Sequence, residues 1–142
     1  QKLGSKLTFI VHSIGATIPL PDQSVDVVLD MMASHFLKEI ERERYIKELH
    51  RVLKPQGILF FKSFYGKGDK HAQDLIKNES AGEHNAYIHP KMKVYEYVWT
   101  DETLNDAFGE QFILQHKELS HQHNIRGKPN KRRSITCYYE KR

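Results

Sequence analysis

Two short apolar runs, separated by a stretch of helical periodicity, constrain the fold of this chain most strongly. Residues 25–29 and 58–61 are too short and too rich in β-branched and aromatic side chains for helices, so each predicts a buried strand. Between the two runs, apolar side chains recur at helical spacing, at Tyr45, Leu49, Val52 and Leu53. We therefore expect a helix over residues 34–54. Buried strands joined through a helix are typical of a parallel sheet that is covered on both faces.

The rest of the chain continues this alternation. The β-branched and aromatic composition of residues 7–11 predicts a strand ahead of the first run, and two more strands are expected from residue 112 and over residues 134–139. Helices are expected over residues 72–77 and over residues 101–108, the second with Thr100 as its N-cap. Pro55 and Gly57 form the turn after the central helix. The long polar stretch before residue 94 is expected to be mainly loop.

Composition limits the class of protein. A chain of 142 residues with a net charge of +4 corresponds to one domain, and no apolar run is long enough to span a bilayer. The single cysteine, Cys137, excludes an internal disulfide and fits a reducing compartment, for which the cytoplasm is the default. The first residue is Gln1 instead of Met, and no secretory signal follows it, so we expect that an upstream segment is missing.

Two motifs then make a resemblance specific. Residues 18–29, IPLPDQSVDVVL, resemble the stretch that links the third and fourth strands of class I S-adenosylmethionine-dependent methyltransferases. Residues 48–59, ELHRVLKPQGIL, resemble the segment that leads into the fifth strand of the same family. The resemblance implies a Rossmann-like α/β sheet that is mostly parallel with an antiparallel C-terminal strand, and S-adenosylmethionine as cofactor. The resemblance also implies that residues 1–142 form a single, partial domain of this kind.

The departures from that family are equally informative. The Gly-rich loop after the family's first strand and the acidic residue that binds the ribose are absent, because the chain begins near the third strand. In the family's strand order, 3-2-1-4-5-7-6, this leaves the fourth strand as an exposed edge, and an unpaired apolar edge favours self-association. Gln56 also stands where the family has the first glycine of its turn. We expect the isolated chain to bind S-adenosylmethionine poorly.

The resemblance assigns cofactor contacts to two segments. The region after the third strand often supplies an Asp to the adenine, and here Ser13, Ile14 and Gly15 stand in its place, so that backbone groups or the Ser13 hydroxyl would serve. Asp30, Met31 and Met32 match positions near the sulfonium, at the carboxyl end of the fourth strand, where open α/β sheets bind ligands. Each has an ordinary alternative, since Asp30 could cap the following helix and the methionines could fill the core.

Substrate contacts are expected from several loops. His35 is the candidate proton acceptor, with a surface histidine at a helix start as the alternative. Phe64 and Tyr65 follow the fifth strand and could form a wall of the substrate site, or Phe64 could simply be buried, and His84 and Tyr87 are candidates from the polar stretch. Between the sixth and seventh strands, residues 126–133 contain five basic side chains, of which Arg126 and Lys128 are the candidate anion contacts. A solvated loop is the alternative for this run.

Three functions remain open from the sequence. The first is methyl transfer to a small-molecule substrate by an incomplete domain. The second is an RNA or protein methyltransferase that uses the basic loop, with nucleic acid as the second choice because no aromatic interleaving supports base stacking. The third is a non-catalytic oligomerisation or regulatory remnant. His121 and His123 share one face if extended, but no third ligand has a recognisable spacing, so no metal site is predicted.

Overall fold

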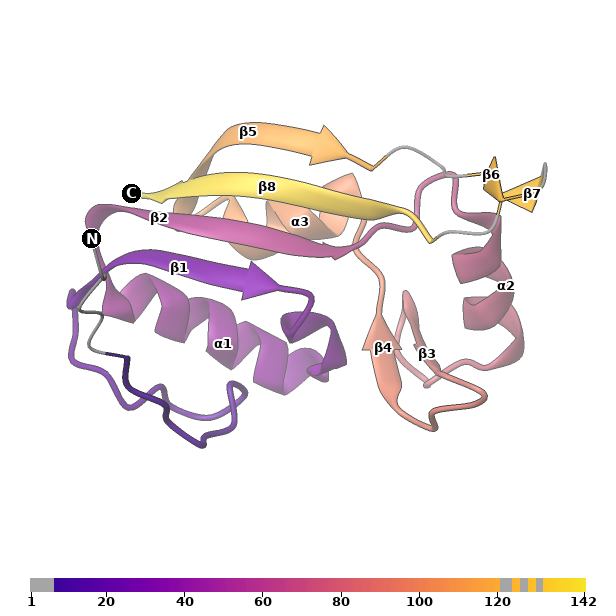
Figure 1. Ribbon diagram of the computed structural model, residues 1–142, viewed down its shortest axis with the longest axis horizontal. Helices are drawn as coiled ribbons and strands as arrows, with labels where there is room; N and C mark the ends of the chain where they lie inside the picture. The colour runs from indigo at the N-terminus through magenta and orange to yellow at the C-terminus, as the bar shows by residue number, and fades with distance from the viewer. Residues whose placement is uncertain (1–6, 121–123, 126–127, 130–131) are drawn as a thin grey trace.

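The computed structural model describes residues 7–120, 124–125, 128–129 and 132–142. Its main sheet has the strand order β1-β2-β8-β5 (Figure 1). These strands are β1 (Val25–Met31), β2 (Leu53–Phe64), β5 (Phe112–Leu119) and β8 (Ser134–Lys141). β1 is parallel to β2, whereas β8 is antiparallel to both β2 and β5. The expected mostly parallel α/β sheet with an antiparallel C-terminal strand is confirmed.

Two helices, α1 (Glu39–Val52) and α3 (Asp101–Phe108), cover one face of this sheet. Their apolar side chains meet alternate residues of the strands in a single core, represented by Leu49 of α1, Phe108 of α3 and Phe61 of β2, each no more than 1% exposed. Aromatic rings contact one another in this core: Phe61 lies edge-on to Trp99 with ring centroids 5.5 Å apart, and Phe108 contacts both rings. Edge-to-face geometry is the arrangement that aromatic pairs prefer.

No described element covers the opposite face, which corrects the expectation of a sheet covered on both sides. In the parallel register Val27 lies beside Ile58 and Leu29 beside Phe60, so these side chains share that face. Val27 is 53% exposed and Leu29 68% exposed. The strand expected over residues 7–11 is wrong, because this segment forms no strand and its large apolar side chains are exposed.

The helix expected over residues 34–54 is divided in two. A short 3-10 helix, η1 (Ser34–Phe36), precedes α1, and α1 ends at Val52. Pro55 therefore lies inside β2, where the register with β1 shifts. The turn residue with a left-handed backbone is Gln56, at φ +62°, and not Gly57.

The remaining elements lie at the carboxyl ends of the parallel strands. They are α2 (Lys70–Asn78) and the short pairs β3 (Ala86–Ile88) with β4 (Tyr95–Tyr97), and β6 (Asn124–Ile125) with β7 (Lys128–Pro129). The helices expected over residues 72–77 and 101–108 are confirmed, and the Thr100 hydroxyl accepts a hydrogen bond from the backbone N–H of Thr103. Among the helices in the described part of the chain, none is long and apolar enough to cross a membrane.

The left-handed backbone of Gln56 generates a stability prediction. A non-glycine residue in this region costs about 1–2 kcal/mol, which glycine avoids at an entropic cost of about 0.4–1 kcal/mol. We expect Gln56→Gly to raise the free energy of unfolding by about 0.5 kcal/mol, measured by urea denaturation. The control, Gln73→Gly at an exposed position inside α2, should lower it by about 0.5 kcal/mol. A loss of stability in Gln56→Gly equal to that in the control would contradict this account.

Candidate functional site

The carboxyl ends of the three parallel strands lie at one edge of the sheet. β1, β2 and β5 end at Met31, Phe64 and Leu119, on the right of Figure 1, and β3, β4, η1 and α2 lie beside these ends. The segment that enters β8 returns to the same edge, because β8 is antiparallel to its neighbours. Ligands of open α/β sheets bind beyond the carboxyl ends of strands, so this edge is the candidate site.

Asp30 fixes the chain at the end of β1. One carboxylate oxygen accepts hydrogen bonds from the backbone N–H groups of Ala33 and Ser34, at 3.1 and 3.3 Å. The other accepts from the Tyr45 hydroxyl of α1 at 3.3 Å, and Asp30 is 2% exposed. These contacts support the capping alternative for Asp30, since both oxygens are already engaged.

His35 lies on η1, next to Ser34, whose backbone N–H donates to Asp30. Its side chain is 3% exposed, which excludes the surface-histidine alternative, and its ring lies edge-on to Phe64 with centroids 4.9 Å apart. Burial lowers the pKa of His35, and the nearby charges of Glu96 and Asp30 oppose that shift. The ring is therefore neutral at pH 7, and its Nδ1 has no hydrogen-bond partner among the described residues.

A charged network lies beside this histidine. Arg132, just ahead of β8, donates from Nη1 to Glu96 Oε2 at 3.1 Å, and the Tyr87 hydroxyl also donates to Glu96. The Arg132 guanidinium lies over the Phe64 ring, 3.9 Å from its centroid. Its Nη2 has no partner in the described part of the chain. Asp69 Oδ2 also lies 3.8 Å from Arg132 Nε, so two carboxylates flank this guanidinium and Nη2 is the group left for a further anion.

The other predicted substrate residues are placed differently. Tyr65 is 2% exposed and its hydroxyl donates to Asp101 Oδ2 at 2.6 Å, so its ring belongs to the core. Burial and this contact raise the pKa of Tyr65 to about 12. His84 is exposed and borders a separate hollow of about 560 Å³ that Gly66 and Thr100 also line. Neither residue joins the group formed by His35, Phe64, Tyr87 and Arg132.

The predicted cofactor residues lie around the beginning of α1. Ser13 and Ala16 close a turn, with the backbone N–H of Ala16 donating to Ser13 O at 3.1 Å, and Ile14 packs against the core. A Cβ on Gly15 would stand 3.0 Å from Glu41 Cβ, so the turn approaches α1 closely. Met31 is 53% exposed, and Met32 is left-handed at φ +63°. The exposure of Met31 argues against a core role for that side chain.

Two predicted residues have side chains that the structure does not describe, and two other residues were not predicted. Arg126 lies outside the described residues, and Lys128 is described only as part of the backbone of β7. Sequence reasoning missed Glu96 and Arg132. Arg132 lies in the basic run of residues 126–133, from which only Arg126 and Lys128 were predicted to bind an anion. For Glu96, the only sequence signal was its position between Tyr95 and Tyr97. No group of three or more potential metal ligands occurs within the described ranges.

Comparison with known proteins agrees with this geometry. Residues 1–61 match the family described as a methyltransferase domain, and no match is found among curated proteins. An S-adenosylmethionine-dependent methyltransferase from Methanosarcina mazei is 22% identical with a TM-score of 0.80, over 99% of this chain and 70% of that chain. The PH0226 protein from Pyrococcus horikoshii is 19% identical with a TM-score of 0.71, over 97% of this chain and 61% of that chain.

A third similar structure holds ligands. It is a Burkholderia thailandensis 1,6-didemethyltoxoflavin-N1-methyltransferase with 1,6-didemethyltoxoflavin and S-adenosylhomocysteine, 12% identical with a TM-score of 0.64, over 94% of this chain and 50% of that chain. These low identities show a shared fold, and this chain spans half to about two thirds of the chains compared. Residues 1–61 thus match the methyltransferase-domain family, and the chain has the fold of the class I methyltransferases, whose cofactor is S-adenosylmethionine.

Proposed function

We propose that this chain forms the substrate side of an S-adenosylmethionine-dependent methyltransferase that acts on a small, acidic molecule. The observation that carries the proposal is the buried, neutral His35, whose Nδ1 lacks a partner and which lies beside Phe64 at the carboxyl end of the sheet. A neutral imidazole in this setting can accept a proton from a substrate hydroxyl or amine. Methyl transfer otherwise depends mainly on how the nucleophile is positioned.

The residues present fit two parts of the cofactor, its adenine and its sulfonium. Met31 and Met32 would border its sulfonium, and the turn of Ser13, Ile14 and Gly15 would offer backbone groups and a hydroxyl to its adenine. Asp30 is 2% exposed and its carboxylate already accepts from Ala33, Ser34 and Tyr45, so it offers little surface to the cofactor. When bound, S-adenosylmethionine supplies an electrophilic methyl group. Its ribose and methionine end would need partners that these residues do not provide.

Three side chains would hold the substrate. Phe64 provides an apolar surface, with His35 on one part of its ring and Arg132 over another. The free Nη2 of Arg132 would bind a carboxylate or phosphate of the substrate, while Glu96 holds the guanidinium in place at 3.1 Å. Charge on the substrate would thereby orient its nucleophile toward His35. We infer an acidic small molecule because such a compound can reach a histidine that is 3% exposed more readily than a folded macromolecule can.

A substitution of the histidine tests this function. We expect His35→Gln to lower the rate of methyl transfer by about 10²–10⁴-fold, because general-base catalysis contributes that much. The assay follows tritiated methyl from S-adenosylmethionine, at millimolar concentration, to hydroxylated or aminated aromatic carboxylates. The rate with unsubstituted protein should fall as pH drops through the pKa of His35, below 6.5, because the base works in its neutral form.

A matched control is available on α2. His71→Gln changes an exposed histidine and should leave the rate and its pH profile unaltered. Equal activity in the His35→Gln variant would contradict the proposed role. Transfer to RNA instead of to the carboxylates would support the second function that the sequence left open.

A second candidate, self-association, rests on the free edge of the sheet. Within the described ranges β1 pairs with β2 on one side only, and its outer face presents Val27, Leu29 and Met31, each more than half exposed. An unpaired apolar strand at a sheet edge is a template for another chain. We infer that β1 joins the β1 strand or the uncovered face of a second copy.

Sedimentation velocity measures this association. We expect the sedimentation coefficient to rise with concentration, and Leu29→Lys to abolish the rise because a charge on an edge strand opposes pairing. Ile40→Lys, which changes an exposed side chain on α1, should leave the association unchanged. A monomer at every concentration before substitution would contradict the inference.

A further inference from the structure

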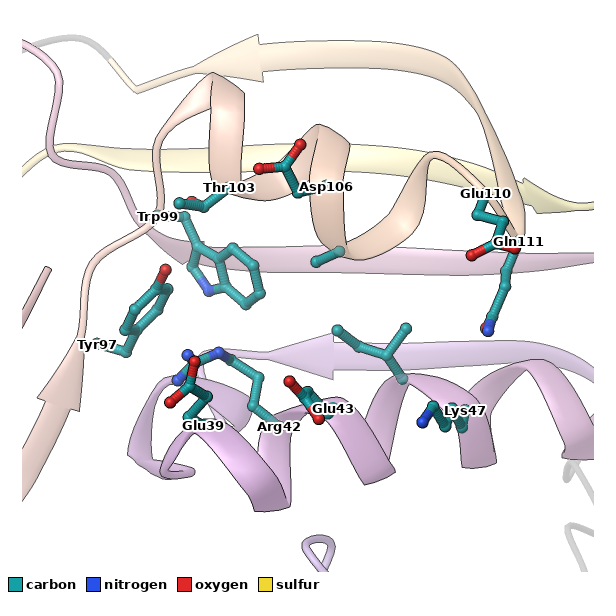
Figure 2. A pocket seen from close by; sticks show the side chains of 12 residues that line it. Glu39, Arg42, Glu43, Lys47, Tyr97, Trp99, Thr103, Asp106, Glu110 and Gln111 are labelled. Carbon is teal, nitrogen blue, oxygen red and sulfur yellow. The ribbon is translucent and has the colours of Figure 1, made fainter. Parts of the chain in front are cut away.

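A groove of about 360 Å³ lies between α1 and α3, on the helical face of the sheet and apart from the site described above. Figure 2 shows its two long walls, with α1 below and α3 above. Ile46 and Ala107 give the groove an apolar lining, and Tyr97 and Trp99 close one end. The volume lies near the lower limit of ligand-binding pockets, about 300–1,000 Å³.

The rim of this groove carries an excess of negative charge. Four exposed carboxylates border it, two on α1 and two on or just beyond α3: Glu39, Glu43, Asp106 and Glu110. None of the four forms an ion pair with a described residue. Glu39 and Glu43 are four residues apart within α1, a spacing at which like charges destabilise a helix by about 0.2–0.5 kcal/mol. A cation in the groove would relieve that repulsion.

The two cationic side chains that line the groove offset only part of this charge. Arg42 is 8% exposed and is held by Glu83, with 2.5 Å between Nη2 and Oε1. Its guanidinium also lies over the Tyr97 ring, 3.6 Å from the centroid. Lys47 is exposed and lies toward the far end of the groove. Four carboxylates therefore face one lysine and one arginine that is already paired.

An independent observation points to a ligand with hydrogen-bonding groups. Trp99 is 1% exposed and its indole Nε1 has no partner among the residues that the structure describes, although a buried unpaired donor costs about 1–3 kcal/mol. In Figure 2 this nitrogen points toward the α1 side of the groove. At the opposite end, the buried Oε1 of Gln111 also lacks a partner in the described part of the chain. The groove thus offers a donor at one end and an acceptor at the other.

We propose that this groove binds an extended basic segment of another protein. A peptide carbonyl would accept from Trp99 Nε1, and a peptide N–H would donate to Gln111 Oε1. Lysine or arginine side chains of the segment would lie between the carboxylates of the two walls. A metal ion or a simple amine offers no acceptor to the indole N–H, so a peptide matches the groove better than either does.

The chain contains a built-in probe for this binding, because Trp99 is its only tryptophan. A capped peptide of alternating glycine and lysine should produce a saturable change in tryptophan fluorescence, and the affinity should fall with added salt. The same peptide with glutamate in place of lysine should produce no change. We expect Glu43→Gln and Asp106→Asn each to weaken binding by roughly three-fold, as partly exposed ion pairs do.

Glu102→Gln is the matched control, because Glu102 is an exposed carboxylate on α3 that does not line the groove. This variant should bind the lysine peptide with unchanged affinity. The proposal would be overturned if spermidine bound as tightly as the peptide, which would indicate a simple cation site. It would also be overturned if the lysine peptide caused no saturable change, or if Glu102→Gln weakened binding as much as Glu43→Gln.

Discussion

The hydrogen bonds of Asp30 are the constraint on which the candidate site depends. This buried carboxylate joins the end of β1, the turn into η1 and the middle of α1 through Ala33, Ser34 and Tyr45. Removing it would leave those donors unpaired in a buried setting, at a cost of about 1–3 kcal/mol for each group that water cannot reach. The cap therefore holds His35 behind the end of β1, where its pKa is lowered by burial.

The site is assembled from segments that are far apart in the sequence. His35 follows β1, Phe64 ends β2, and Arg132 precedes β8, yet the Phe64 ring contacts both of the other side chains. Because β1 and β2 are parallel and β8 is antiparallel, all three segments meet at the same edge. The sheet topology thus explains why His35 and the Arg132 guanidinium both contact the ring of Phe64.

Sequence patterns predicted the strands and helices wherever local composition and burial agree, as in β1 and in α3 with its Thr100 cap. They failed where the outcome depends on a partner. Residues 7–11 have the composition of a strand, but no described strand lies beside them to complete their backbone hydrogen bonds. This segment therefore forms no strand. The partners of Glu96 could not be predicted either, because its contact with Arg132 spans 36 positions and requires the hairpin of β3 and β4 to be in place.

The pH titration of the His35 imidazole, followed by NMR, tests the central claim most directly. The signal is assigned by its absence from the His35→Gln variant. This account predicts a midpoint below the ordinary value of 6.5, because burial behind the Asp30 cap disfavours the charged ring more than the nearby carboxylates favour it. A midpoint at or above 6.5 would show that His35 is solvated or paired as a cation, and would contradict its role as a neutral proton acceptor.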